Sequence, residues 1–510
     1  MTLKELDFTK DIMLNHPTEA QGPSISMYRM ALEAWRRGIQ VRFMTVYVKN
    51  HIKIRHKLSY GGKTYRFQLS LGDKVAKEAR QIGKSKERTK EHLSAAGVSV
   101  PEGKVLTVKN NDFAGAMDYA DSISYPVIVK PAHASLAIGV RTNLQNRDDL
   151  ADALKYVHEE LGYADIIIER HATGFDTRAY VIEDQLIAAF KRIAAHVEGD
   201  GEHTVEQLID LKNQQRRLNP HLSASQIKID DRLINYLGGK GYTLETVLKK
   251  GEQTNLTDST FAKDASDTVD ITDEVTADYK MTAVNAVKSI PGMNMGGVDI
   301  IRDEEKDTNK VLEINCRPDL GGHMFPIYGE SIDVSKKILD YYFPETASID
   351  KGINDYFTFD FDKIFRFLKQ GVVKEVILPP IPKGKLENVH MELSGNVPYY
   401  KNIISNSATG HRLGGHLKML KNKRAKLVVA GTTKHLTEFL ENLLKIAPKL
   451  DIKVTAQNEW DSLMMYKFEA SESIGMGSVN RLRRESKAMK EEIIELKKEL
   501  AELKSEASNQ

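Results

Sequence analysis

Cysteine, long apolar runs and an excess of charge of one sign are all scarce in this chain of 510 residues. Cys316 is its only cysteine, which excludes an intrachain disulfide framework. No window of about 18 apolar residues suggests a membrane-spanning helix, and the polar N-terminus does not read as a signal peptide. The formal net charge of +2 provides no bulk attraction to nucleic acid or membrane. We therefore expect a cytoplasmic protein with neither nucleic acid nor membrane as a partner.

The length and composition predict several globular domains. Hydrophobic residues make up 41% and charged residues 28% of the chain, which is typical of a protein with packed cores. Helical and strand patterns are mixed, so we expect an α/β (α+β) architecture. We expect the chain to divide at residues 1–82, 83–346, 347–384, 385–470 and 476–506, where 347–384 is an extended, proline-containing linker.

The most informative stretch is a predicted hairpin, with strands at 297–301 and 311–315 joined by a charged turn. In an antiparallel pair, Asp299 lies across from Glu313 and Asn315, and alternation places the latter two on one face. Three oxygen donors, two of them anionic, suit Mg²⁺. The alternative is a hairpin whose acids are only solvated. These acids interrupt apolar strands, however, where an unpaired carboxylate is costly.

The hairpin resembles the ATP-grasp family of carboxylate–amine ligases, whose last metal-binding strand ends in Glu-x-Asn. The residues that follow look most like the branch of cyanophycin synthetase and bifunctional glutathione synthetase; they are Arg317, Pro318, Gly321, His323, Pro326 and Gly329. The resemblance implies an ATP-grasp fold preceded by a small α/β domain. It also implies ATP and Mg²⁺, with Mn²⁺ as a possible substitute, and small-molecule carboxylate and amine substrates such as an amino acid or a peptide.

Two lysines and a loop are candidates for contacts to the nucleotide phosphates. Lys86 opens a predicted helix in a pattern similar to the start of the ATP-grasp fold, although a solvated helix residue is the alternative. Lys130 interrupts a buried apolar strand, so it must pair with an anion or emerge into a cleft. The small residues Ser135 and Gly139 belong to a loop that can fold its amide groups over phosphate oxygens. Family members usually have more glycine in this loop.

Further nucleotide contacts are implied by the resemblance alone. It implies that the chain at Glu169, Arg170, His171 and Ala172 borders the adenine through backbone groups. It also implies that Asp176 binds the ribose hydroxyls, in a position where many members have Glu. We assign Lys191 to the phosphates or the adenine.

Four residues are candidates for substrate binding and catalysis. Arg192 precedes a Gly-Asp-Gly turn and the helix cap Thr204, and its planar guanidinium can hold a carboxylate or the transferring phosphoryl group. Arg317 is expected to share that catalytic role. Arg178 is a further candidate for substrate binding, and His323 for orienting the incoming amine.

Residues 385–470 predict a separate unit with the order strand, helix, strand, strand, helix, strand. This is the split β-α-β ferredoxin-like arrangement, and the sequence resembles acylphosphatase. Lys401 and Met419 stand where that family has its phosphate-binding Arg and its water-orienting Asn. A lysine cannot reproduce a bidentate phosphate contact. We therefore expect binding or docking rather than hydrolysis in this unit.

The C-terminal residues 476–506 carry apolar residues at two heptad positions over almost four heptads. Such a strict repeat with dense charges favours a coiled coil over a helix packed on its own domain. We expect a homo-oligomer formed through this segment.

Together these patterns predict an ATP-dependent ligase that forms an amide through an acyl phosphate. Two alternatives belong to other classes. One is a non-catalytic nucleotide-sensing scaffold, and the other is an acyl phosphate hydrolase that acts through its C-terminal domain.

Overall fold

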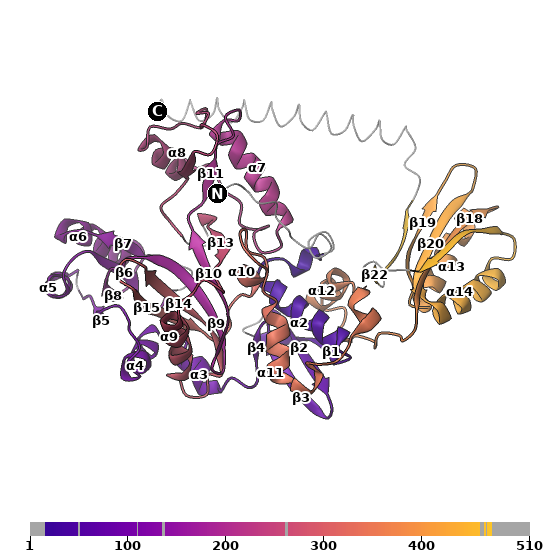
Figure 1. The fold of residues 1–510 in the computed structure, drawn as a ribbon, viewed down its shortest axis with the longest axis horizontal. Helices are drawn as coiled ribbons and strands as arrows, with labels where there is room; N and C mark the ends of the chain where they lie inside the picture. Colours follow the sequence, from indigo (N-terminus) through magenta and orange to yellow (C-terminus); the bar gives the residue numbers. More distant parts are fainter. Residues whose placement is uncertain are drawn as a thin grey trace. The chain divides into compact units, whose positions relative to one another are not determined.

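A computed structural model gives the fold of the protein (Figure 1). It describes residues 16–48, 51–109, 111–134, 138–260, 264–459, 464–465 and 467–471. The expected mixed α/β architecture is confirmed. None of the helices within these ranges has both the length and the apolar character that a bilayer crossing requires. The expected coiled coil at 476–506 lies outside the described residues and stays a prediction.

The chain forms two compact units. The first comprises residues 1–351 and 361–381, and the second comprises residues 352–360 and 382–510. Among the described residues, the first unit contains three sheets of four or five strands, which we name the N-terminal, the small and the central sheet. Short helical turns in the two units are η1 (Thr18–Ala20), η2 (Gly22–Ser24), η3 (Tyr156–Glu160), η5 (Pro344–Thr346) and η6 (Gly352–Tyr356).

The N-terminal sheet has the strand order β17-β1-β2-β3-β4. Its strands are β1 (Gln40–Val48), β2 (His51–Tyr60), β3 (Lys63–Gln68), β4 (Leu71–Gly72) and β17 (Glu375–Ile377). Helix α2 (Ile25–Arg36) packs on this sheet and also against α11 (Val334–Tyr342). Phe43, His56 and Phe67 are completely or almost completely buried within the sheet. The following short helix, α3 (Lys77–Ile82), leads into the next part of the unit.

The small sheet has the order β5-β8-β6-β7. Its strands are β5 (Gly103–Thr107), β6 (Val127–Pro131), β7 (Arg141–Leu144) and β8 (Asp165–Arg170). Helices α5 (Ala114–Ile123) and α6 (Arg147–Lys155) cover one face, where Val127, Val129 and Ile168 are buried (Figure 1). Because strand side chains alternate, Lys130, Ile167 and Glu169 point to the other face.

The central sheet has the order β13-β10-β9-β14-β15. Its strands are β9 (Phe175–Ile182), β10 (Gln185–Ile193), β13 (Asp267–Asp270), β14 (Met295–Asp303) and β15 (Thr308–Asn315). Helix α9 (Ala277–Lys288) packs on one face of this sheet (Figure 1), where the Tyr279 and Thr177 hydroxyls lie 2.8 Å apart. The opposite face remains for polar side chains, and it is the face on which the candidate site is built.

An insertion between β10 and β13 has a small core of its own. It contains β11 (His196–Glu198), α7 (Val205–Leu218), α8 (Asp231–Gly238) and β12 (Gln253–Asn255). Thr204 caps α7 as expected: its hydroxyl accepts from the Gln207 N–H, and the Gln207 side chain accepts from the Thr204 N–H. Arg216, on α7, is fully buried and pairs with the buried carboxylate of Asp267.

The structure differs from the sequence prediction at residues 347–384, which do not form an extended linker throughout. Helix α12 (Phe361–Lys369) buries Phe361, Phe365 and Leu368 in the first unit. Strand β17 then pairs with β1, with Arg42 opposite Ile377. The prediction relied on the prolines at positions 379, 380 and 382 and overlooked the helical spacing of these three apolar side chains. Their burial stabilises the helix.

The second unit contains a sheet of order β21-β18-β20-β19-β23. Its elements are β18 (Leu386–Ser394), α13 (Val397–Gly410), β19 (Gly414–Met419), β20 (Ala425–Thr432), α14 (Thr433–Ile446), β21 (Asp451–Glu459) and β23 (Phe468–Ser471); β16 (Phe357–Thr358) pairs with β22 (Met464–Met465). The sheet and the two helices enclose one hydrophobic core. The relation of this unit to acylphosphatase stays a prediction.

Candidate active site

The expected hairpin is present as β14 and β15, and it brings the three candidate metal ligands together. Asp299 lies directly opposite Glu313, and Gly297 lies opposite Asn315. The Asn315 amide nitrogen is 3.0 Å from an Asp299 carboxylate oxygen and 2.9 Å from a Glu313 carboxylate oxygen. A β-bulge follows Asp299 and ends the regular register at the point where these side chains converge.

Two arginines from neighbouring strands surround Asp299. The Arg178 guanidinium donates to both carboxylate oxygens, at 2.7 and 2.6 Å, in a bidentate arrangement. Arg192 lies 3.4 Å from the same carboxylate and 2.6 Å from Asp176. Burial opposes ionisation of Asp299, but Arg178 and Arg192 outweigh it and hold its pKa well below the usual range. Asp299 is therefore an anion at neutral pH.

Glu313 responds in the opposite direction. Burial, and then the neighbouring charge of Asp299, raise the pKa of Glu313 above its usual value. Two carboxylates this close create a local excess of negative charge that a divalent cation would neutralise. A half-turn of the Asn315 amide would present its oxygen in place of its nitrogen. The donor set of two carboxylates and one amide therefore fits Mg²⁺. In the described ranges, no three His, Cys, Asp or Glu side chains are placed so that they alone could hold a metal ion.

A second charged cluster lies on the small sheet and is centred on the buried Glu169. Its carboxylate accepts from Lys130 at 2.5 Å and from Lys90 at 3.1 Å, and Lys90 also donates to the Gly103 carbonyl at 3.0 Å. Burial would raise the pKa of Glu169, but the two lysines outweigh this effect and lower it. The pKa of Lys86 is lowered by burial and by the nearby Lys130. Three ammonium groups thus face one carboxylate, so this region favours an anionic ligand.

These residues line a pocket of about 340 Å³ between α4 (Lys86–Ala95), the small sheet and β15. Its polar lining residues are Lys86, Glu87, Lys90, Glu91, Ser94, Lys104, Lys130 and Glu169, and Ile167 and Leu312 are among its apolar ones. A pocket with an apolar wall and a few converging charges is typical of a small-molecule site. Leu312 immediately precedes Glu313, so β15 links this pocket to the candidate metal ligands.

The loop after β6 is described only at its ends, and Ser135 lies outside the described residues. Lys86 donates to the Ala134 carbonyl at 3.1 Å, which ties the start of this loop to α4. Gly139 has a φ of +71°, and a Cβ there would lie 2.8 Å from Pro131. Glycine is therefore required where the loop returns to β7.

Some residues that are predicted to contact the nucleotide lie apart from the charged side chains around Asp299. Lys191 is in register with Thr177 and Val269, so it points away from its neighbour Arg192, and its ammonium group lies 3.5 Å from the centre of the Phe175 ring. In the segment that follows Glu169, the N–H groups of Arg170 and His171 already donate to backbone carbonyls, and Ala172 follows them at the end of β8. The roles of these residues stay predictions.

Residues 317–325, which follow β15, place the remaining predicted substrate residues. Arg317 is exposed at the start of this segment. His323, within α10 (Gly321–Met324), is buried between Tyr180 and Phe190, whose ring centres lie 6.0 and 4.6 Å from its own. Burial, and next the positive charge of Arg178, lower the pKa of His323 to about 3. His323 is therefore neutral at physiological pH.

The structure adds residues that the sequence did not single out. His221 lies 3.4 Å from Asp319, and its ring is so close to Gly321 that a Cβ there would lie 2.4 Å from its Nδ1. Burial opposes ionisation of Asp319, but the neighbouring His221 helps to lower its pKa. No local pattern identifies His221, because its partner is distant in sequence. Lys90 was identifiable, since it lies one helical turn from Lys86.

Comparison with known proteins bears on this arrangement. Residues 85–191 match the family model described as the carbamoyl-phosphate synthase L chain, ATP binding domain. Cyanophycin synthetase of Crocosphaera subtropica is 30% identical over 295 residues, which cover 56% of this chain and 33% of that protein. The expected resemblance to ATP-grasp ligases is confirmed. The glutathione biosynthesis bifunctional protein GshAB of Clostridium perfringens is 28% identical and covers 62% of this chain and 41% of that protein.

The family model covers residues 85–191 of the first unit, and the chain spans only about a third to two fifths of the length of these relatives. A crystal structure of a bifunctional glutathione synthetase from Pasteurella multocida is 24% identical, with a TM-score of 0.47, and covers 59% of this chain and 42% of that chain. The matched residues 85–191 contain Lys86, Lys90, Lys130, Glu169 and Arg178, and Arg192 follows directly.

Proposed function

We propose that the protein is an ATP-dependent ligase that joins a carboxylate to an amine through an acyl phosphate. The observation that carries this proposal is the convergence of Asp299, Glu313 and Asn315 beside Arg178 and Arg192, on the strands that adjoin a lysine-lined pocket. The similarity to cyanophycin synthetase and to the glutathione biosynthesis protein supports an amino acid or a peptide as the substrate.

ATP is expected to bind with its phosphates at Lys86 and Lys130 and its adenine against Ile167 and Leu312. Asp299, Glu313 and Asn315 would hold Mg²⁺, which would neutralise charge on the phosphate oxygens. Mn²⁺ could take the same ligands. Asp176 pairs with Arg192, so a ribose hydroxyl binding Asp176 would approach the same guanidinium. The chain supplies position and charge, and no side-chain nucleophile is needed.

In the first step, a carboxylate oxygen of the substrate bonds to the γ-phosphorus of ATP, the bond from that phosphorus to the bridging oxygen breaks, and ADP leaves. Arg192 is placed to stabilise the transferring group, and Arg317 to hold the substrate carboxylate. Arg178 is already bidentate on Asp299, which suits it to orienting that ligand. The product of this step is an acyl phosphate.

In the second step, the amine nitrogen bonds to the acyl carbon, the carbon–oxygen bond to phosphate breaks, and inorganic phosphate leaves. The amine must lose a proton, and His221, paired with Asp319, is placed to accept it. His323 is only 2% exposed, so we assign it to the wall that orients the amine rather than to proton transfer.

The proposal is tested by phosphate release from ATP with Mg²⁺ against amino acids, dipeptides and small carboxylic acids, with mass spectrometry of the products. We expect release that needs both an acid and an amine and gives a dehydrated adduct. Glu313→Ala is expected to abolish release, whereas the exposed Glu304→Ala, in the turn of the same hairpin, is not. Binding of ATP without any stimulated turnover across the panel would instead favour a nucleotide-sensing scaffold.

A further inference from the structure

Residues 317–325 link the candidate site to the N-terminal part of the chain. This segment carries Arg317 and His323, and two serine hydroxyls from the N-terminal residues are bonded to its backbone. We propose that Ser26 and Ser70 are positioning residues that set the pocket for the carboxylate substrate. The proposal rests on the ligase function and adds to it that the N-terminal sheet and α2 take part in selecting the acid.

Ser70 holds the start of the segment. It follows β3, is completely buried, and donates from its hydroxyl to the Pro318 carbonyl at 2.8 Å. Pro318 in turn packs against Gly297 on β14, where a Cβ would lie 2.7 Å from the proline ring. The position of the residue next to Arg317 is therefore fixed from both sides, by the N-terminal sheet and by the hairpin that carries Asp299.

Ser26 holds the middle of the segment. Its hydroxyl, 1% exposed on the first turn of α2, accepts from the Leu320 N–H at 3.3 Å. Leu320 is completely buried and precedes α10, the turn that contains His323. If this hydroxyl were lost, a buried N–H would remain without a partner, and such a loss is costlier than the net worth of the bond.

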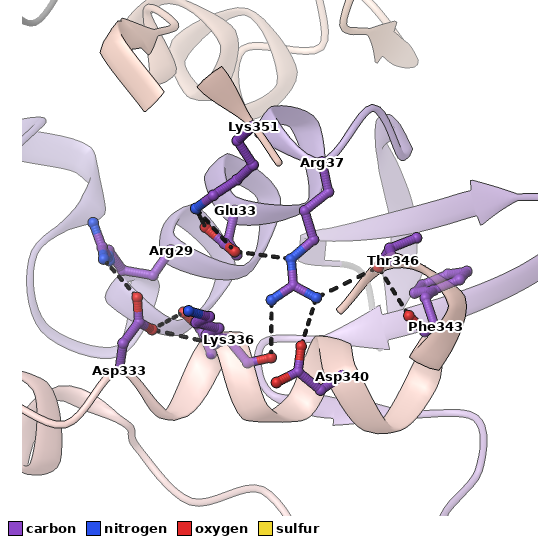
Figure 2. A network of polar contacts seen from close by, with 10 residues as sticks. Arg29, Glu33, Arg37, Asp333, Lys336, Asp340, Phe343, Thr346 and Lys351 are labelled. Atoms are coloured by element: carbon purple, nitrogen blue, oxygen red, sulfur yellow. Dashed lines mark hydrogen bonds and ion pairs between the residues drawn. The ribbon is translucent and has the colours of Figure 1, made fainter. Parts of the chain in front are cut away.

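Helix α2 is itself held rigidly, so Ser26 stands on a fixed support. Arg29 pairs with Asp333, the N-cap of α11, at 3.0 Å. Arg37 donates to Glu33 at 2.8 Å and to Asp340 of α11 at 2.7 Å, and Lys351 also pairs with Glu33. Figure 2 shows these side chains bridging the two helices. Buried, multiply bonded charges of this kind fix geometry more than they add stability.

The insertion contacts the same segment from residues 219–223. The Asn219 amide donates to the Phe325 carbonyl at 3.1 Å, and His221 lies against Asp319 and Gly321. This turn is bonded directly to the N-terminal residues, because the Gly22 N–H donates to the Pro220 carbonyl and Ser223 to the Gln21 side chain. The segment is therefore framed by the N-terminal residues and by the element that carries His221.

These contacts lie away from the lysines of the nucleotide pocket, so their loss is expected to affect one substrate selectively. A displaced segment moves Arg317 and His323, while Lys86, Lys130 and Glu169 keep their partners. A residue that acts only through folding would instead lower all kinetic parameters together. A raised KM for the acid with an unchanged KM for ATP would therefore indicate a positioning role.

The first experiment needs no substrate and measures hydrogen exchange in the full-length free protein. Ser26→Ala and Ser70→Ala are each expected to speed exchange of the peptide containing residues 317–325 by about tenfold, since each removes one buried bond to it. Exchange in β14 and β15 is expected to stay unchanged. Unchanged exchange at 317–325 in both variants would overturn the proposal, whatever the activity proves to be.

The second experiment measures hydroxamate formation with ATP, Mg²⁺ and hydroxylamine, using whichever acid of the panel gives the fastest reaction with the native protein. Each serine variant is expected to raise KM for that acid about tenfold, with kcat and KM for ATP within about twofold. An unchanged KM for the acid, together with faster exchange, would overturn the selecting role while leaving the ligase function intact. If no acid reacts, the ligase proposal fails and so does the selecting role, and the exchange result stands alone.

Thr346→Val is the matched control. Thr346 is 1% exposed and also donates from its hydroxyl to a backbone carbonyl, that of Phe343 at 2.8 Å, but no hydrogen bond among the described residues joins it to residues 317–325. Its hydroxyl also accepts from Arg37 at 3.4 Å, but Arg37 keeps its pairs with Glu33 and Asp340, so α2 is expected to stay in place. It is expected to lower Tm about as much as the serine variants without changing KM for the acid. If Thr346→Val and the serine variants have the same kinetic profile, the serines are structural and the proposal is wrong.

Discussion

The central sheet and the sheet of the second unit differ in the kind of side chain that they bury at the positions we considered for function. On the central sheet, Asp299 and Arg178 are buried charges that stand where apolar side chains would cost less. In the second unit, Met419 occupies the position where the acylphosphatase resemblance expects a water-orienting Asn, and it belongs to the hydrophobic core. The central sheet thus buries charge at the site where we propose chemistry, whereas the second unit buries an apolar side chain at the position that the predicted resemblance singles out.

The largest effect is expected from breaking the buried pair itself. Arg178→Met leaves Asp299 buried with only Arg192 and Asn315 beside it, which is expected to cost about 3 kcal/mol of unfolding free energy and most of the activity. Urea unfolding and phosphate release measure the two losses.

The control for this variant is Arg147→Met, which removes the exposed pairs of Arg147 with Asp118 and Asp121 of α5. Its cost is expected to be below about 1 kcal/mol. Equal costs for the two variants would contradict the view that the central sheet carries its charges against a stability penalty.

The nucleotide pocket offers a second comparison, between a lysine that is paired with Glu169 and one that is not. Lys130→Met leaves Glu169 with Lys90 as its remaining partner and removes a cation from the phosphate region. We expect KM for ATP to rise about tenfold, because one charge-assisted contact is lost. Lys104→Met is the matched control, since Lys104 lines the same pocket but directs its ammonium group over the Tyr119 ring at 4.2 Å. A similar rise in both variants would mean that general charge, rather than the Glu169 cluster, decides ATP affinity.

His56 tests how a buried ionisable side chain outside the candidate site affects the free energy of unfolding. It is fully buried and stacked on Phe67 with ring centres 5.2 Å apart, and neither ring nitrogen has a hydrogen-bond partner among the described residues. Burial lowers its pKa from 6.5 to about 3. Between these values the unfolded chain binds more protons than the folded one, so stability present above pH 6.5 is lost as the pH falls.

The expected loss through His56 is about 1.4 kcal/mol for each pH unit below 6.5. His56→Phe keeps an aromatic ring in place and is expected to flatten the dependence of Tm on pH between 6.5 and 4. The exposed His51→Phe, on the same strand, is the control and should leave the slope unchanged. A slope that is the same in His56→Phe and the native protein would show that other groups govern acid sensitivity.

The smallest effect is expected from the second unit, whose activity as an acyl phosphate hydrolase should be nil. Met419 is only 8% exposed, and Lys401, which lies within α13, stands where the predicted acylphosphatase resemblance expects an arginine. Benzoyl phosphate should therefore be hydrolysed no faster with the full chain than in buffer. If the Glu313→Ala variant still catalysed hydrolysis of benzoyl phosphate, the catalytic activity would belong to the second unit and our expectation would be wrong.

The sequence was sufficient for features that depend on local periodicity. Alternation along two strands places Asp299 opposite Glu313, and Thr204 is the expected cap of α7; both are seen. The same alternation would have shown that Lys191 faces away from Arg192. The pairing of His221 with Asp319 could not be read in this way, because it depends on how a distant turn packs.

Long-range packing also explains the part of the fold that the sequence did not predict. Strand β17 joins the N-terminal sheet only because β1 offers a free edge more than 300 residues earlier in the chain. Helix α12 is short, and its stability comes from burial of Phe361 and Phe365 rather than from local propensity. Neither partner is visible in the sequence of residues 347–384.

The most direct test of the central claim follows oxygen from the carboxylate. The acid that stimulates phosphate release is labelled with ¹⁸O in its carboxyl group and turned over with ATP, Mg²⁺ and its amine. An acyl phosphate intermediate predicts one ¹⁸O atom in each inorganic phosphate released, and none of this transfer in Glu313→Ala. Phosphate free of label would show that water attacks ATP directly, which contradicts the proposed ligase mechanism.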